Sequence, residues 1–318
     1  MLAESGFFDR APRRYYVRLV GTVAAMVAFA ALASQRAGSL AGAIAAVLVG
    51  IAWGQLGFYG HDAVHGAVAR GRRRNALVGH VCLSVFNGLG FQYWRRIHVA
   101  HHRHLQSEEL DPDLDFPTLL SMTPRAARAK TTFWRRVGRW QAWYFWPLTT
   151  LYAHRLRWQG LARMLRAPSR YRIDLVLVPL HFIVWLIVPS LLWTPTVALT
   201  TYVIASASAG IYLGAVFAIN HIGMHAIASD EQVDLFARHF RCTRNIGNPA
   251  ALDFLFGGLN FHTAHHLFPR VPHTCLRRGR DALNRFAKSR ELTYHEVTLP
   301  AAIVSVSRHL AAVAQVLH

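Results

Sequence analysis

The sequence predicts an all-α integral membrane protein, with four transmembrane helices in two hairpins and a cytosolic helical cap. Composition is the first reason. Hydrophobic residues make up 53% of the 318 residues and charged residues only 16%, whereas soluble domains carry about 25% charged residues. The second and third reasons are four long apolar runs and a one-sided distribution of basic residues. A disordered chain is excluded, and a soluble enzyme is disfavoured.

Each predicted span is a run of about 20 apolar residues, the length that a hydrocarbon core roughly 30 Å thick requires. The spans cover residues 16–33, 40–59, 175–193 and 196–219. Very short turns separate the first run from the second and the third from the fourth, so each pair is expected to form a hairpin. Residues 60–172 and 220–318 then lie on one side as the cap of a single domain, 1–318.

The basic residues indicate which side this is. Of the 35 lysines and arginines, all except Arg36 lie in or beside segments that are expected on one face of the membrane. Basic loop residues are retained in the cytoplasm. Both termini and the cap are therefore expected to be cytoplasmic, and the net charge of +19 reports topology rather than binding to nucleic acid. Two shorter apolar segments, 76–91 and 143–152, are expected to lie in the membrane interface or to re-enter the membrane.

The three cysteines have none of the spacings of a thiolate metal site or a disulfide framework, and reduced thiols are expected. Histidine is more informative, since 19 histidines outnumber the 16 acidic residues. Ten of them form two i, i+4 pairs and two i, i+3, i+4 triplets. They are His61, His65, His98, His101, His102, His221, His225, His262, His265 and His266.

This spacing predicts a metal centre. Residues three and four positions apart share one face of a helix, so each pair or triplet directs its imidazoles toward one point. Ten ligands are too many for one zinc ion, which takes about four. Two ions with about five nitrogen ligands each fit better. Alternatively, one ligand position is filled by a water molecule that Asn220 holds. Iron is the redox-active choice among the metals that imidazole suits. The other nine histidines are expected to pack or to face solvent.

The clusters read HDAVH at 61–65, HVAHH at 98–102, NHIGMH at 220–225 and HTAHH at 262–266. Together with DPD at 111–113, they resemble the integral-membrane fatty acid desaturase family, whose mark is three histidine boxes. The resemblance covers roughly residues 40–290. The third box begins with His262 where the front-end subgroup has Gln, which argues against that subgroup. No HPGG motif of a fused cytochrome b5 is found, so electrons are expected from a separate protein of ferredoxin or cytochrome b5 type.

The resemblance implies a non-haem diiron centre that uses O₂ to desaturate a fatty acyl chain linked to lipid, CoA or a carrier protein. It implies no catalytic residue beyond the metal centre. Its fourth element leaves open whether Asn220 or His221 faces the metal. Acidic residues are expected to orient the ligating rings, and the candidates are Asp62, Asp113 and Asp253. Two alternatives remain: a hydroxylase on the same scaffold, and a metal-ion transporter. A transporter would need ligands in mid-membrane, where only His181 lies.

Overall fold

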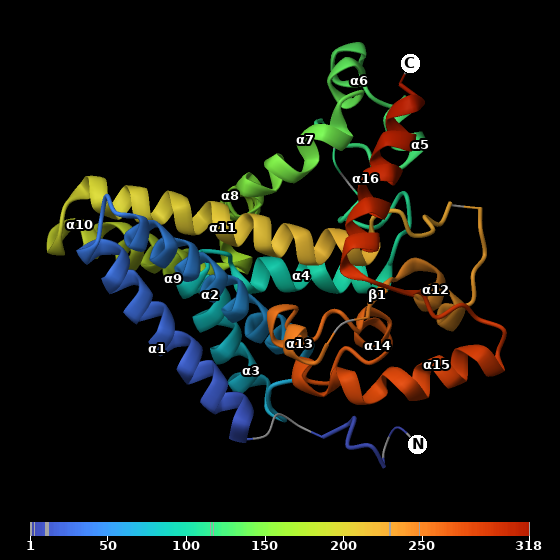
Figure 1. Cartoon of the computed structure of the whole chain (residues 1–318), viewed down its shortest axis with the longest axis horizontal. Helices are drawn as coiled ribbons and strands as arrows, with labels where there is room; N and C mark the ends of the chain where they lie inside the picture. The colour runs from blue at the N-terminus through green and yellow to red at the C-terminus, as the bar shows by residue number, and fades with distance from the viewer. Residues whose placement is uncertain are drawn as a thin grey trace. The chain divides into compact units, whose positions relative to one another are not determined.

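The computed structural model describes residues 2, 4–9, 13–114, 116, 118–228, 230–247 and 249–317, and it is mostly helical (Figure 1). The chain divides into two compact units. The membrane unit consists of Asp9–Arg96 and Thr149–Gly214. The histidine unit consists of Met1–Phe8, Ile97–Leu148 and Ala215–His318. Helices α4 and α11 contribute residues to both.

Among the described residues, four helical stretches are long and apolar enough to cross a membrane, as the sequence predicts. They are α1 (Arg13–Gln35), α2 (Leu40–His65), the stretch formed by α9 (Arg172–Phe182), η4 (Ile183–Ile187) and α10 (Val188–Leu192), and α11 (Pro195–His221). Ser39 begins α2 by accepting a hydrogen bond from the amide of Gly42. Helix α2 continues to His65, beyond the predicted end of the second span at residue 59.

Aromatic side chains form the core of the membrane unit. Trp53 and Tyr59 of α2 are fully buried and pack with Tyr15 of α1 and with Trp185 and Tyr202 of the last two spans. Small residues let α2 and α11 approach, since a Cβ at Gly50 would lie 2.2 Å from the carbonyl oxygen of Ala205. Large apolar side chains remain exposed elsewhere on the spans, as a lipid-facing surface requires.

The shorter elements of the membrane unit are α3 (Arg72–Gly79), the π-helix η1 (His80–Phe86), η2 (Thr149–Leu151), α8 (Tyr152–Arg166) and η3 (Pro168–Arg170). The apolar segment 76–91 thus consists of the end of α3, all of η1, the non-helical residues 87–90 and the first residue of α4 (Phe91–Arg103). Neither this segment nor 143–152 is among the helices long enough to span a membrane. Their interfacial position stays a prediction.

The histidine unit is built from short helices. These are the end of α4, α5 (Pro124–Arg128), α6 (Thr132–Gly138), α7 (Gln141–Leu148), α12 (Leu235–Cys242), α13 (Ala251–Leu255), α14 (His262–Leu267), η5 (His273–Gly279), α15 (Arg280–Ser289) and α16 (Leu299–Gln315). Helix α16, red in Figure 1, is tied to α7 by bonds from Gln141 Nε2 to the Leu310 carbonyl (2.9 Å) and from Trp146 Nε1 to Ser307 Oγ (3.0 Å).

The prediction of an all-α fold is incomplete. Two strands, β1 (Asn245–Ile246) and β2 (Glu296–Val297), pair in parallel in the histidine unit. Each has two residues, too few to produce the alternation by which a strand is recognised in a sequence. The three cysteines are free and buried, in agreement with the prediction that they form no disulfide framework.

Candidate metal centre

Helix α4 carries the histidine triplet of the second box. The rings of His98 and His102, one helical turn apart, have centroids 4.6 Å from each other. The third box forms α14, a helix of six residues in which His262, His265 and His266 are all buried. Both triplets are therefore helical, as their spacing predicts. Their imidazole nitrogens gather in two groups within the histidine unit.

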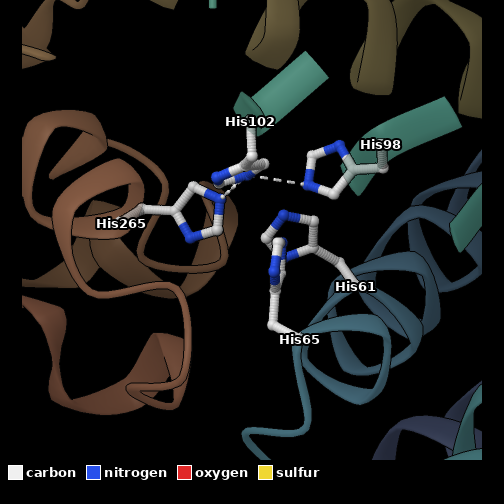
Figure 2. A group of neighbouring side chains, drawn as sticks. All are labelled: His61, His65, His98, His102 and His265. Atoms are coloured by element: carbon white, nitrogen blue, oxygen red, sulfur yellow. Dashed lines mark hydrogen bonds between the residues drawn. The ribbon is translucent and has the colours of Figure 1, made fainter. Parts of the chain in front are cut away.

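The first group contains His98, His102 and His265. The Nε2 atom of His102 lies 3.1 Å from Nε2 of His98 and 2.9 Å from Nε2 of His265 (Figure 2). Each of the three rings offers one nitrogen within 4.8 Å of the others. Three nitrogen donors from two helices therefore converge at one point.

The second group contains His101, His221, His262 and His266. The Nε2 atom of His221 is 2.7 Å from Nε2 of His262 and 3.2 Å from Nε2 of His266, and those two are 3.1 Å apart. His101 also offers a nitrogen within 4.8 Å of those of His221 and His266. The rings of His102 and His266 stack with centroids 4.2 Å apart, so the two groups adjoin.

Hydrogen bonds at the opposite ring nitrogen fix how these rings can bind. The Nδ1 atoms of His221 and His262 lie 3.2 Å from the carbonyl oxygens of Cys242 and Leu259. A carbonyl only accepts, so Nδ1 carries the proton and the neutral ring has a lone pair at Nε2. Two lone pairs then face each other across the 2.7 Å between His221 and His262, an arrangement that a proton or a metal ion between them stabilises. Ligands at right angles around an ion with metal–nitrogen bonds of about 2.1 Å lie about 3 Å apart, so the observed spacings fit a metal.

A buried carboxylate holds the fourth ring of this group. Oxygens of Asp111 lie 2.9 and 3.1 Å from Nδ1 of His101. Burial opposes a charge on His101, but Asp113 and Asp111 outweigh it and raise the pKa of His101 to about 9. For His266, burial and the neighbouring histidines hold the pKa well below its usual range. A low pKa favours the neutral ring that binds a metal, and in His101 a metal at Nε2 would take the place of the second proton.

The first box lies at the end of α2, in the membrane unit. The rings of His61 and His65 are neighbours on the last turns of that helix, with centroids 4.9 Å apart (Figure 2). Each offers a nitrogen within 4.8 Å of the other. Helix α2 ends directly after His65 because Gly66 adopts the left-handed conformation, with φ of 73°. The pair therefore occupies the final turns of a long buried helix.

Residues 37–298 match the model of the family described as fatty acid desaturase. The chain belongs to the fatty acid desaturase family. It is 29% identical over 264 residues to an acyl-lipid (9-3)-desaturase of Borago officinalis, a match that covers 78% of this chain and 58% of that protein. It is 28% identical over 320 residues to Delta(8)-fatty-acid desaturase 2 of Arabidopsis thaliana, covering 93% of this chain and 69% of that protein.

A third relative is a Delta 8-(E)-sphingolipid desaturase of Emericella nidulans, 24% identical over 277 residues, covering 79% of this chain and 50% of that protein. The chain thus spans between half and about seven tenths of the length of these three relatives. The family match covers all ten histidines proposed from the sequence.

The acidic residues of this desaturase-family chain have different surroundings. Asp62 accepts a hydrogen bond from the Tyr15 hydroxyl (3.1 Å), and its Oδ1 is 4.0 Å from Nδ1 of His61. Asp113 lies 3.3 Å from Nδ1 of His101, with its side chain 55% exposed. Asp253 instead pairs with Arg277 and accepts from Asn260 Nδ2 (3.0 Å).

Asp111 is the residue that the sequence-based choice of Asp113 missed. It is buried, it is closer to His101, and it also accepts bonds from the amides of Gln106 (2.7 Å) and Asp113 (2.9 Å). Those amide bonds fold the loop around its carboxylate. The DPD stretch pointed to the place, but nothing in it tells which of two acids turns inward.

The NHIGMH element contributes only one ring to the two groups. His221 belongs to the second group, whereas Nε2 of His225 lies 2.8 and 2.9 Å from the oxygens of Glu231, and its side chain is 43% exposed. No converging set of ligand atoms in the described part of the chain includes His225. Asn220 donates from Nδ2 to the carbonyl of Val216 (2.8 Å), and its buried Oδ1 has no hydrogen-bond partner among the described residues.

Proposed function

We propose that this chain binds two iron ions and uses O₂ to desaturate a fatty acyl chain. The observation that carries the proposal is the second histidine group. There the Nε2 atoms of His221 and His262 face each other at 2.7 Å while each Nδ1 is committed to a backbone carbonyl. Family membership supports the same conclusion.

We assign the ligands by group. One ion takes His98, His102 and His265, and we add His61 and His65 because the HxxxH spacing of the first box marks them as ligands in the sequence. The other takes His101, His221, His262 and His266, with the free oxygen of Asn220 holding a water ligand. His225 is left out of this set because it already pairs with Glu231. Each ion then has about five ligands, in keeping with its chemistry.

A bound diiron pair supplies the O₂ activation that removal of hydrogen from an unactivated methylene requires. One hydrogen leaves each of two neighbouring carbons, a double bond forms between them, and O₂ is reduced to two molecules of water. The balance needs two further electrons and two protons, which a separate electron-donor protein and solvent supply. The chain's own residues hold the rings: Asp111 keeps a proton at Nδ1 of His101, and backbone carbonyls do the same for His221 and His262.

We propose a lipid-linked acyl chain as the substrate, because the relatives include enzymes named acyl-lipid and sphingolipid desaturases. The four apolar helices support access to a substrate that resides in the membrane. We retain the two-hairpin topology with a cytosolic active site as part of this proposal, on the distribution of lysine and arginine.

The test combines metal analysis with product analysis. The full chain is expressed in a host that lacks the product, and the host lipids are analysed by gas chromatography with mass spectrometry. We expect acyl chains two hydrogens lighter than their precursors, and about two iron ions per purified chain. Acyl chains that gain a hydroxyl group without a new double bond would instead establish a hydroxylase. Cellular metal accumulation without any new lipid would favour the transporter.

A further inference from the structure

Helix α4, which carries three of the proposed ligands, has no cap of its own. The residue before its first turn is Gly90, which offers no side-chain oxygen. The first amide groups of a helix have no partner within the helix and need acceptors from elsewhere. For α4 these acceptors come from η1 and α9, two elements of the membrane unit. The amide of Phe91 donates to Ser84 Oγ (3.1 Å), and those of Gln92 and Tyr93 donate to Asp174 Oδ2 (2.8 and 3.2 Å).

Asp174 is at the centre of this arrangement. It lies in the first turn of α9 and is fully buried. Its second oxygen accepts from Ser84 Oγ (3.1 Å) and lies 3.3 Å from Nδ1 of His80. One carboxylate therefore receives bonds at both oxygens, and its negative charge faces the positive end of the α4 dipole. Among the described residues, its ion-pair partner is His80 rather than an arginine or lysine.

The chain in front of α4 is shaped around this carboxylate. A Cβ atom at Gly90 would lie 2.8 Å from Oδ2 of Asp174 and 2.8 Å from Sδ of Met164. Only glycine allows so close an approach without displacing its neighbours. Gly90 therefore leaves α4 without a local cap and also makes room for the distant cap, Asp174.

We propose that Asp174 is a positioning residue for the metal centre, because it fixes where α4 begins and how the helix is rotated. Successive residues of a helix are turned by about 100°. A start displaced by one residue would thus turn His98, His101 and His102 away from the points at which they converge. The effect on metal rests on the proposed function, whereas the anchoring of α4 does not.

Asp234 provides a matched control. Its Oδ1 accepts from the amides of Phe236 (2.9 Å) and Ala237 (3.1 Å), so it caps α12 as Asp174 caps α4. Helix α12 carries no proposed ligand, and its Cys242 carbonyl, which accepts from His221, lies at the opposite end of the helix from Asp234. Loss of either cap weakens one helix start, but only loss of the cap on α4 should disturb the metal.

The experiment compares Asp174→Ala, Asp174→Asn and Asp234→Ala in the full chain in detergent. Two quantities are measured: hydrogen exchange of the peptide covering residues 91–103, and the affinity and absorption spectrum of added Co²⁺. For Asp174→Ala we expect exchange at least about tenfold faster, Co²⁺ affinity at least about tenfold weaker and an altered spectrum. Asp174→Asn should have a smaller effect because its amide oxygen can still accept bonds from the α4 amides. Asp234→Ala should match the wild type in both.

A folded Asp174→Ala protein with wild-type exchange over residues 91–103 would overturn the anchoring. Faster exchange with unchanged Co²⁺ affinity and spectrum would overturn the positioning role. If Asp174→Ala does not fold, Asp174→Asn and Ser84→Ala decide by the same two criteria. A wild-type chain that binds no Co²⁺ would refute the proposed metal centre instead, and the exchange comparison would still test the anchor.

Discussion

His181 of the membrane unit and His221 of the histidine unit have opposite kinds of partner. In the membrane unit, His181 has a carbonyl oxygen, that of Val85, at 3.2 Å from Nδ1 and the Tyr202 hydroxyl at 3.0 Å from Nε2. The Nδ1 atom of His80 lies 3.3 Å from Ser84 Oγ and 3.3 Å from Asp174 Oδ1. In the histidine unit, rings such as His221 and His262 face each other through the same nitrogen.

This difference in hydrogen-bond partners separates structural histidines from the proposed ligands. A ring between a donor and an acceptor is complete as a hydrogen-bonded group, and a cation adds nothing to it. Rings that turn lone pairs toward one another are complete only with a cation between them. The chemistry of the hydrogen-bond partners, rather than burial, therefore marks the proposed metal centre, since His181 is fully buried too.

The variant that tests this comparison most strongly removes one of the two facing rings. We expect His221→Ala to lose iron from one of the two positions and to give no detectable desaturated product, because its Nε2 faces two other ligands. Iron per chain and the lipid profile are the measurements. A variant that keeps both iron ions and full product formation would remove His221 from the site.

Asp111 should have the next largest effect. We expect Asp111→Asn to weaken iron binding by about 10- to 100-fold, because the residue orients His101 and favours its ligating tautomer. Asp113→Asn is the matched control, since Asp113 is more exposed and lies at 3.3 Å from the same nitrogen. Iron titration of both metal-free variants measures the difference, and equal losses would contradict the assignment of the main role to Asp111.

His181 should affect stability and leave the metal unchanged. Replacing it with Phe keeps a ring beside Trp53 but leaves the Tyr202 hydroxyl and the Val85 carbonyl without this partner. We expect a loss of about 1–3 kcal/mol in the free energy of unfolding, measured as a lower melting temperature in detergent. Iron per folded chain should equal that of the wild type. A decrease would show that the hydrogen-bond partners of a ring do not distinguish structural histidines from ligands.

The smallest effect is expected at His225. Its pairing with Glu231 is exposed, and exposed ion pairs contribute little. We expect His225→Ala to retain both iron ions and the product profile. Loss of iron in this variant would return His225 to the ligand set and indicate that the NHIGMH segment rearranges when metal binds.

Much of the fold and the site could be predicted from the sequence, because apolar length and histidine spacing are local properties. Four spans and two helical HxxHH triplets follow directly from them. Long-range contacts could not be predicted. Nothing in the sequence relates Asp174 to Gln92, 82 residues earlier, and nothing in DPD distinguishes Asp111 from Asp113. The choice of His221 rather than His225 as a proposed ligand depends on where α11 ends. The periodicity of apolar residues in the sequence does not show where that is.

The most direct test of the central claim is X-ray absorption at the iron edge of the purified full chain. The facing Nε2 atoms predict a first shell of nitrogen at about 2.1 Å around each iron, together with scattering from whole imidazole rings. In His221→Ala this imidazole scattering should decrease. Iron bound without imidazole scattering, or a wild-type chain that retains no iron, would contradict the account.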